Sequence, residues 1–268
     1  MTIAGPFAAG AWLLAAAAYA LRPRAADRLR IARRLGDALL LLGVVLGVAL
    51  IAGLWLSLER PPLRTLGETR WWYAVLVPAL GLLLGARFGT RALAIPACLM
   101  GATFALINLA HPEHMDRTLM PALQSPWFVP HVVVNILAYA ALGLSSLVAA
   151  VVLVRRLGRR EPVTASDADL PHRLVLVGFP LLTCGLVFGA FWAKEAWGHY
   201  WAWDPKETWA FLTWSAYLVY LHARTRHSPA PARSLALLVA GFGVLLVSWF
   251  GVQHLPTANE SVHTYARD

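Results

Sequence analysis

The sequence predicts an all-α fold: a polytopic membrane helix bundle of about eight transmembrane helices, with both termini outside. Three observations predict it. Hydrophobic residues make up 59% of the 268 residues and charged residues only 14%, which leaves too few polar side chains to cover a soluble globule. Apolar runs recur at about the 20 residues that a helix needs to cross a bilayer core of about 30 Å. Basic residues are concentrated in alternate loops between these runs.

The apolar runs give the expected elements in chain order. They cover residues 3–21, 38–58, 71–86, 92–110, 129–154, 174–193, 207–222 and 235–252. Two of them, 71–86 and 207–222, are short for a span and rich in Trp and Tyr, which favour the membrane interface. The other runs have the length and composition of membrane helices.

The net charge of +9 could suggest nucleic acid as a partner, but its distribution favours membrane topology and no nucleic acid. With the amino terminus outside, the inner loops hold 16 of the 23 basic residues, and the outer loops hold 7 basic and 9 of the 14 acidic residues. This bias follows the positive-inside rule. The inner basic residues are Arg22, Arg24, Arg28, Arg30, Arg33, Arg34, Arg87, Arg91, Arg155, Arg156, Arg159, Arg160, Arg173, Arg224, Arg226 and Arg233.

We expect a single membrane domain over residues 1–268, because the sequence shows no repeat and no long linker. The first apolar run is expected to be a retained helix, since its basic residues follow it instead of preceding it. Cys98 and Cys184 form no C-x-x-C pair, so neither a disulfide framework nor a thiol reductant is indicated.

The segment 197–209, Trp-Gly-His-Tyr-Trp-Ala-Trp-Asp-Pro-Lys-Glu-Thr-Trp, carries the densest chemistry and is expected on the outer surface. It holds Trp197, Trp201, Trp203 and Trp209. One interpretation is an aromatic belt at the membrane interface. The other is an apolar platform for a large planar ligand, because indole faces stack on extended π-systems.

Asp204 and Glu207 also have two interpretations. Asp-Pro-Lys-Glu is typical of a helix start, with Asp204 as N-cap, Pro205 as the first helical residue and Glu207 as the reciprocal partner. Either carboxylate could instead contact a ligand. The two roles are compatible, since a fixed helix start would also fix the aromatic residues before it.

Three of the nine histidines stand out by position. His131 begins the fifth predicted helix at the outer surface, His222 ends the seventh at the inner surface, and His263 lies in the outer tail. Imidazole is a common axial ligand of haem iron, so outer histidines beside an aromatic platform suit haem. A histidine at a membrane surface can also be a polar residue that tolerates the interface. His222 lies 15 residues beyond Glu207, about 23 Å along a helix, so it cannot share the outer site.

The segment 197–209 resembles the tryptophan-rich signature of the CcsA family of cytochrome c biogenesis proteins. The resemblance extends through Leu-Thr-Trp at 212–214 and Tyr-Leu-His-Ala-Arg at 220–224. A second stretch, 122–131, followed by Tyr-Ala-Ala-Leu at 139–142, also looks like this family. The signature region therefore runs over about 122–265, and the first 120 residues are similar only in hydropathy.

The resemblance implies transport of haem b to the outer membrane face and its presentation there for covalent attachment to an apocytochrome c. It implies that His131 and His263 are the outer axial ligands of the haem iron and that His222 binds haem on the inner side. It also implies haem contact by Trp197, Trp201, Trp203, Asp204 and Trp209. No catalytic residue is assigned beyond this haem site.

The resemblance further implies several partners and a location. The partners are a second membrane protein of the CcsB (ResB) type, the apocytochrome c and a thiol-reducing thioredoxin-like protein. The location is the bacterial cytoplasmic membrane, with the plastid thylakoid membrane as the alternative. The chain would be a subunit of a holocytochrome c synthase. Its tail departs from the family, because 253–265 lacks the usual glycine, and this leaves His254 as a competing ligand to His263.

Three other functions remain open on the sequence. The first is a haem transporter or chaperone that attaches nothing. The second is the related haem chaperone of the other bacterial maturation pathway, which usually has fewer helices. The third is a structural scaffold with an aromatic belt, which predicts no bound chromophore.

Overall fold

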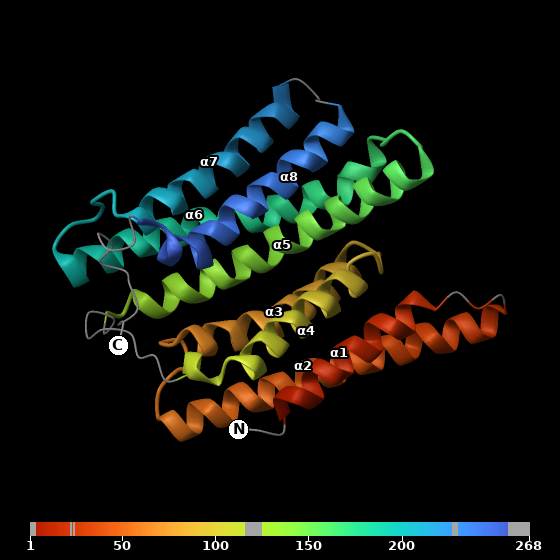
Figure 1. Cartoon of the computed structure of the whole chain (residues 1–268), viewed down its shortest axis with the longest axis horizontal. Helices are drawn as coiled ribbons and strands as arrows, with labels where there is room; N and C mark the ends of the chain where they lie inside the picture. Colours follow the sequence, from red (N-terminus) through yellow and green to blue (C-terminus); the bar gives the residue numbers. More distant parts are fainter. Residues whose placement is uncertain (1–3, 22, 24, 116–124, 227–229, 257–268) are drawn as a thin grey trace. The chain divides into compact units, whose positions relative to one another are not determined.

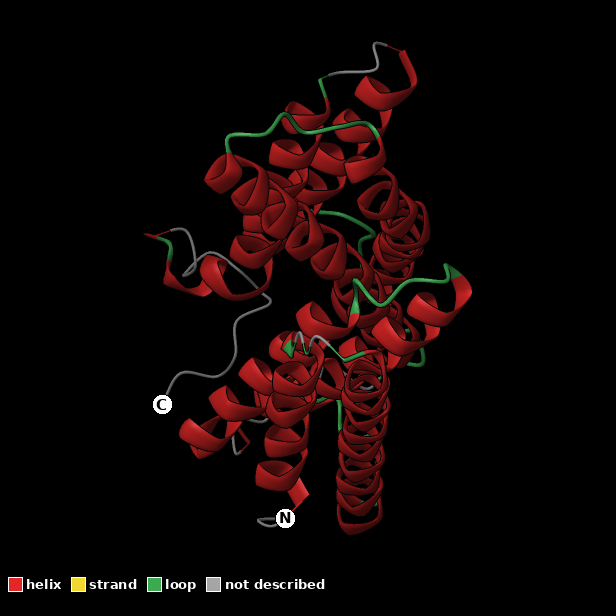
Figure 2. Cartoon of the chain, turned by 90° about the vertical axis from the view of Figure 1, so that its right-hand side faces the viewer, coloured by secondary structure: helices red, strands yellow, loops and turns green. Residues whose placement is uncertain are grey.

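The computed structural model describes residues 4–21, 23, 25–115, 125–226 and 230–256. All regular secondary structure in this part of the chain is helical (Figure 2). Eight α-helices correspond to the eight predicted runs, which confirms the predicted fold class. They are α1 (Ala4–Ala20), α2 (Ala26–Leu58), α3 (Leu66–Arg87), α4 (Ala94–Ala110), α5 (Phe128–Arg159), α6 (Asp169–Trp197), α7 (Pro205–Arg226) and α8 (Pro231–Leu246).

The lengths of the helices fit a multi-pass membrane protein. Among the described residues, five helical segments are long and apolar enough to cross a membrane, and they contain α2, α3, α5, α6 and α8. The apolar helices α1 and α4 have 17 residues each, at the short end of the spanning range. α7 has 22 residues but carries more polar side chains than the others.

Several helices are longer than the apolar runs that predict them. α2 begins at Ala26 instead of residue 38, because its first turns contain Arg28, Arg30, Arg33 and Arg34, which favour helix but not hydrocarbon. α3 and α7 both reach 22 residues, so the two short runs belong to helices of ordinary membrane length.

The chain divides into two compact units, residues 1–119 and 120–268. In the first unit α1 packs against α2 and α4, α3 packs against α4, and α2 contacts α3. In the second unit α5 packs against α6 and α8, and α7 packs against α8 and α6. The expectation of one membrane domain stays a prediction.

Glycines allow the close approach of helices in the first unit. A Cβ on Gly43 of α2 would lie 2.4 Å from the indole nitrogen of Trp12, and one on Gly47 would lie 2.4 Å from Val75. Membrane helices associate through close packing, because lipid provides little hydrophobic drive, and small residues permit that packing. The fully buried Trp12 therefore fixes how α1 and α2 pack.

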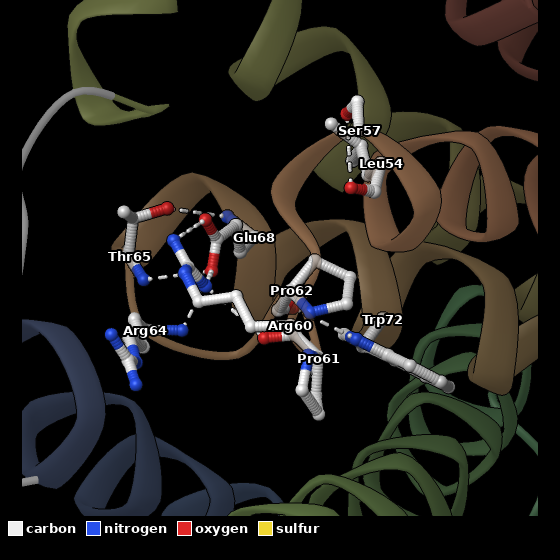
Figure 3. Close-up of polar contacts among 9 residues, drawn as sticks. All are labelled: Leu54, Ser57, Arg60, Pro61, Pro62, Arg64, Thr65, Glu68 and Trp72. Atoms are coloured by element: carbon white, nitrogen blue, oxygen red, sulfur yellow. Dashed lines mark hydrogen bonds and ion pairs between the residues drawn. The ribbon is translucent and has the colours of Figure 1, made fainter. Parts of the chain in front are cut away.

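A capping network fixes the start of α3 (Figure 3). The hydroxyl of Thr65 accepts the backbone N–H of Glu68 at 3.0 Å, and the Glu68 carboxylate accepts the N–H groups of Thr65 and Arg64. Arg60 donates two further hydrogen bonds to the same carboxylate, at 3.0 and 2.8 Å. Glu68 is only 2% exposed, so these donors offset the cost of burying its charge.

The second unit has a core to which all four helices contribute. Ala168, in the short 3₁₀ turn before α6, also belongs to this core. The core residues are Ala138, Leu142, Ala149, Ala168, Val175, Leu182, Tyr217, Tyr220, Leu235, Leu238 and Leu245. Hydrogen bonds link neighbouring helices: Ser146 donates to the Leu238 carbonyl at 2.8 Å, and the Trp214 indole donates to Thr183 at 3.0 Å. Such bonds contribute about 0.6–2 kcal/mol each within a membrane.

The connection between α5 and α6 is closed by the carboxylate of Asp167. It accepts the backbone N–H of Thr164 at 2.8 Å and hydrogen bonds from Arg156. These interactions lower the pKa of the Asp167 carboxyl, with the Thr164 N–H as the largest cause. The turn therefore joins two long antiparallel helices whose opposite ends form the candidate site.

Candidate functional site

The predicted outer residues that the structure describes lie at one end of the second unit. There α5 begins, α6 ends and α7 begins, and the segment between α6 and α7 loops over that end (Figure 1). α8 continues through a π-helical turn (Val247–Gly251) and a short 3₁₀ turn (Val252–His254), which pack against α7. The predicted tryptophan-rich segment 197–209 comprises the last residue of α6, the α6–α7 connection and the first turn of α7.

His131 lies in the first turn of α5 and its ring faces α6. Its Nδ1 atom is 2.8 Å from the carbonyl oxygen of Gly185 and 3.2 Å from the side-chain nitrogen of Asn135. Asn135 also donates a hydrogen bond of 2.9 Å to the His131 carbonyl. The ring stacks on Trp192, with centroids 5.6 Å apart and planes inclined by 25°.

Two glycines one turn apart on α6 make room for these side chains. A Cβ on Gly189 would lie 2.8 Å from Cε1 and 2.9 Å from Nδ1 of His131. A Cβ on Gly185 would lie 2.4 Å from the side-chain oxygen of Asn135. The His131 ring and the Asn135 amide therefore lie against bare backbone of α6.

Further aromatic pairs lie at this end of α5 and α6. Trp192 contacts Trp197 edge to face at 4.8 Å and Phe128 at 5.7 Å. Trp127 contacts Phe191 at 4.8 Å. Trp192 is buried and Trp197 is half-buried. The aromatic contacts therefore lead from the stacked pair of His131 and Trp192 toward the surface at Trp197.

The end of α6 is capped by Lys194. Gly198 follows the helix with φ = +84°, a left-handed conformation that favours glycine, and its carbonyl accepts a 2.7 Å hydrogen bond from the Lys194 ammonium. The same ammonium lies 5.5 Å from the centre of the Tyr200 ring. Lys194 is thus engaged locally and orients the beginning of the connection.

Trp203 has a backbone conformation that is rare for its residue type. Its φ is +60°, in the left-handed region that costs a non-glycine residue about 1–2 kcal/mol. Its side chain is 63% exposed and meets Trp201 edge to face at 5.7 Å and Phe211 at 5.8 Å. The fold thus holds a strained, exposed tryptophan directly before the cap of α7, and such strain concentrates at functional sites.

The start of α7 explains how this conformation is held. The Asp204 side chain accepts the backbone N–H of Lys206 at 2.8 Å. The Glu207 carboxylate accepts the N–H groups of Ala202 at 2.8 Å and of Asp204 at 3.2 Å, on both sides of Trp203. Both carboxylates are buried. The predicted helix-cap role of Asp204 and the reciprocal role of Glu207 are both found in this geometry.

A second group of rings continues from Trp203 along α7. Phe211 stacks with Trp214 at 6.1 Å, and Trp214 stacks with Phe179 of α6 at 5.7 Å. Trp209 lies one turn into α7, half-buried, and its carbonyl accepts the hydroxyl of Thr213. The predicted residues Trp201 and Trp203 belong to this group, and Trp197 belongs to the group around His131.

His222 lies at the opposite end of α7 with an exposed side chain. α7 is continuous from Pro205 to Arg226, so the predicted separation from the outer residues holds. His172 and Tyr220 meet near the same end, with Nδ1 3.2 Å from the phenol oxygen. Any ligand at His222 therefore uses a site distinct from the one around His131.

His263 lies outside the described residues, so its position stays a prediction. The competing residue His254 ends the short turn after α8 and is exposed.

Sequence reasoning missed Asn135, Gly185, Gly189 and Trp192. One signal could have indicated them, because His131 and Asn135 are four residues apart, as are Gly185 and Gly189, and residues at this spacing share a helix face. Nothing in the sequence alone shows that these two faces meet.

The chemistry of these residues suits an apolar, planar metal complex. An imidazole supplies a nitrogen ligand for iron, and the indole faces supply apolar contact. The residues at this end of the second unit therefore fit a haem as cargo.

Comparison with known proteins gives the same direction. The family model described as "Cytochrome C assembly protein" matches residues 67–258, which cover nearly all of α3, all of α4 and the second unit up to residue 258. The match thus begins well before the motifs visible in the sequence.

Individual relatives agree. "Cytochrome c biogenesis protein CcsA" of Prochlorococcus marinus subsp. pastoris is 35% identical over 243 residues, covering 79% of this chain and 76% of the relative. The protein of that name from Synechococcus elongatus is 32% identical over 271 residues, covering 81% and 82%. The one from Chlamydomonas reinhardtii is 38% identical over 178 residues, covering 63% of this chain and 49% of that relative.

A solved structure shares the fold. "Cytochrome c Heme Lyase CcmF" matches with a TM-score of 0.64 at 22% identity, over 92% of this chain and 46% of that chain. This chain therefore spans less than half the length of that protein, and the likeness concerns the fold alone.

Proposed function

This chain belongs to the cytochrome c assembly protein family, with relatives named CcsA, and we propose that it carries haem b to the outer membrane face and presents it for covalent attachment to an apocytochrome c. The observation that carries the proposal is the His131 ring, which is stacked on Trp192 at the end of the bundle where the tryptophan-rich connection lies. An iron ligand and an aromatic surface are the two groups that haem presentation needs.

His131 and His263 are proposed as the outer axial ligands and His222 as the inner one. Trp197, Trp201, Trp203 and Trp209 are proposed to contact the macrocycle. Asp204 acts mainly by capping α7. Lys194 and Lys206, the two lysines of the sequence, lie close to the tryptophans along the chain and are proposed to bind the haem propionates. His131 lies at the end of the second unit where α7 begins, and His222 lies near the other end of this 22-residue helix. Histidines at both ends of the unit suit a cargo that crosses the membrane.

In the attachment step each cysteine thiol of the apocytochrome adds across one haem vinyl group. The sulfur bonds to one vinyl carbon and the other carbon gains a hydrogen, so no oxidant is needed. This chain's part is orientation: replacement of one axial imidazole by the histidine of the incoming Cys-x-x-Cys-His segment would align thiols and vinyl groups by proximity. The thiols must be reduced by another protein, and we propose a thioredoxin-like one.

We further propose a CcsB (ResB) type partner and the bacterial cytoplasmic membrane as the location. The test is to co-purify the chain with such a partner, record the visible spectrum and supply haem and an apocytochrome peptide. Covalent haem on the peptide supports a synthase. Bound haem without attachment supports the alternative, a transporter or chaperone, and a colourless preparation contradicts both.

A further inference from the structure

We propose that Gly185 and Gly189 of α6 are positioning residues for His131: together they fix which ring nitrogen carries the proton and leave Nε2 as the ligand nitrogen. This inference rests on the proposed function, because it takes His131 as an axial ligand of the haem iron. It assigns a part in that function to the face of α6 that carries Gly185 and Gly189, where backbone and no side chain faces His131 and Asn135.

The first step concerns the proton on the His131 ring. Nδ1 lies 2.8 Å from the Gly185 carbonyl oxygen, and a carbonyl oxygen can only accept a hydrogen bond. A lone pair on Nδ1 would repel that oxygen, so Nδ1 carries the proton. In the neutral ring the lone pair is then on Nε2, which is the nitrogen able to bind iron.

The Asn135 side chain offers a competing arrangement. Its nitrogen lies 3.2 Å from Nδ1 and could donate only if Nδ1 were unprotonated. The longer distance makes this the weaker contact, and the same amide already donates to the His131 carbonyl at 2.9 Å. The Gly185 carbonyl therefore decides the tautomer.

The second step concerns the space that Gly189 leaves. A methyl group there would meet Cε1 at 2.8 Å and Nδ1 at 2.9 Å, whereas ordinary contacts begin at 3.4 Å. The obstructed atoms are the end of a flexible side chain, so the ring would turn away and α6 would stay in place. The bond to Gly185 and the stacking on Trp192 would then be lost together.

Groups that orient a metal-binding histidine through its second nitrogen typically change metal affinity 10–100-fold when they are lost. We therefore expect Gly189→Ala to weaken haem binding by about 10–100-fold. Gly243→Ala in α8 is the matched control, because a Cβ there meets nothing within 4 Å. It should leave haem binding unchanged.

The measurement uses the full chain with its partner, titrated with haem and followed by visible and electron paramagnetic resonance spectra. Imidazole separates positioning from damage. In His131→Gly and in the double variant His131→Gly/Gly189→Ala, free imidazole should restore the bis-imidazole spectrum to the same extent, because an untethered ring can shift to avoid the methyl group. Poor rescue of the double variant alone would mean that Ala at 189 harms the surrounding site, which overturns the positioning role.

A readout without haem tests the tautomer directly. Nitrogen NMR of histidine-labelled protein, with His131→Gly identifying the signals, should show a protonated Nδ1 in the unaltered chain and in Asn135→Leu, and a mixed tautomer in Gly189→Ala. A protonated Nε2 in the unaltered chain would overturn the inference. If that proton were on Nε2 only when Asn135 is present, and on Nδ1 in Asn135→Leu, then Asn135 would decide the tautomer.

The failures are distinguishable. If the unaltered protein binds no haem, the proposed function fails. If it binds haem and His131→Gly responds to imidazole, but Gly189→Ala equals Gly243→Ala in affinity, the function stands and this inference fails.

Discussion

At the scale of single residues, the environment of an imidazole decides what it can do. His131 packs against helix backbone and an indole face, whereas His222 is exposed at the far end of α7. Two residues of the same type therefore have different surroundings, and we expect them to serve different steps.

Replacement of either proposed outer ligand by glycine should leave a cavity that imidazole can fill. We expect haem attachment to fall sharply in His131→Gly and in His263→Gly and to recover in part with millimolar-scale imidazole, because its nitrogen can replace the missing ligand. His222→Gly should instead reduce the haem that reaches the outer face. Attachment assays with and without imidazole measure this.

His254→Gly is the control for this series and should be nearly silent. If His254→Gly were the variant rescued by imidazole and His263→Gly were silent, the tail ligand would be His254. If no outer substitution changed haem content, the axial pair would be wrong.

The left-handed backbone of Trp203 gives a second prediction at this scale. Trp203→Gly and Trp203→Ala both remove the indole, but glycine adopts φ = +60° without strain. Trp203→Gly should therefore be the more stable variant by about 1 kcal/mol in unfolding measurements. At Trp201, which has no positive φ, the order should be reversed, with Ala above Gly. If the Ala variant were the more stable one at both positions, the strain at Trp203 would not be present in solution.

At the scale of elements, helix starts position the functional segments. α3 and α7 both begin with a carboxylate that accepts backbone N–H groups, Glu68 in one and Glu207 in the other. Such caps orient the chain before the helix, which in α7 is the tryptophan-rich connection.

We predict that Asp204 acts through this cap more than through its charge. Asp204→Asn and Asp204→Ser, both good N-caps, should retain much of the haem, whereas Asp204→Ala should lower the free energy of unfolding by about 0.5–2 kcal/mol. Trp201→Ala together with Trp203→Ala should lose the haem. Haem content and thermal unfolding of the purified variants are the measurements, and a severe loss in Asp204→Asn would show that the charge itself contacts the ligand.

At the scale of the whole molecule, eight spans require the two ends of the chain to lie on the same side of the membrane. Reporter fusions after Leu157 and Arg226 should read as inside, and fusions after Arg117 and at the carboxyl terminus as outside. This follows from the bias of basic residues toward alternate loops. A carboxyl terminus on the inside would contradict the topology and separate His263 from the tryptophan-rich connection.

The amino-acid sequence alone predicts the features that depend on local composition. Apolar runs predicted the eight α-helices found among the described residues, and Asp204-Pro205-Lys206-Glu207 predicted the start of α7. Both predictions were possible because burial in lipid and capping depend on residues close together along the chain. The apolar runs underestimated helix length where charged turns extend beyond the hydrocarbon, as at the start of α2.

Which helix faces meet depends on the packing of the folded chain. Gly185 and Gly189 are ordinary small residues in the sequence, and Trp192 is one tryptophan among 12. Their relation to His131 arises because α5 and α6 pack closely enough for an imidazole to contact backbone. The left-handed conformation of Trp203 likewise depends on where the Glu207 carboxylate lies. A distance between residues 54 positions apart is a property of packing, and no local pattern encodes it.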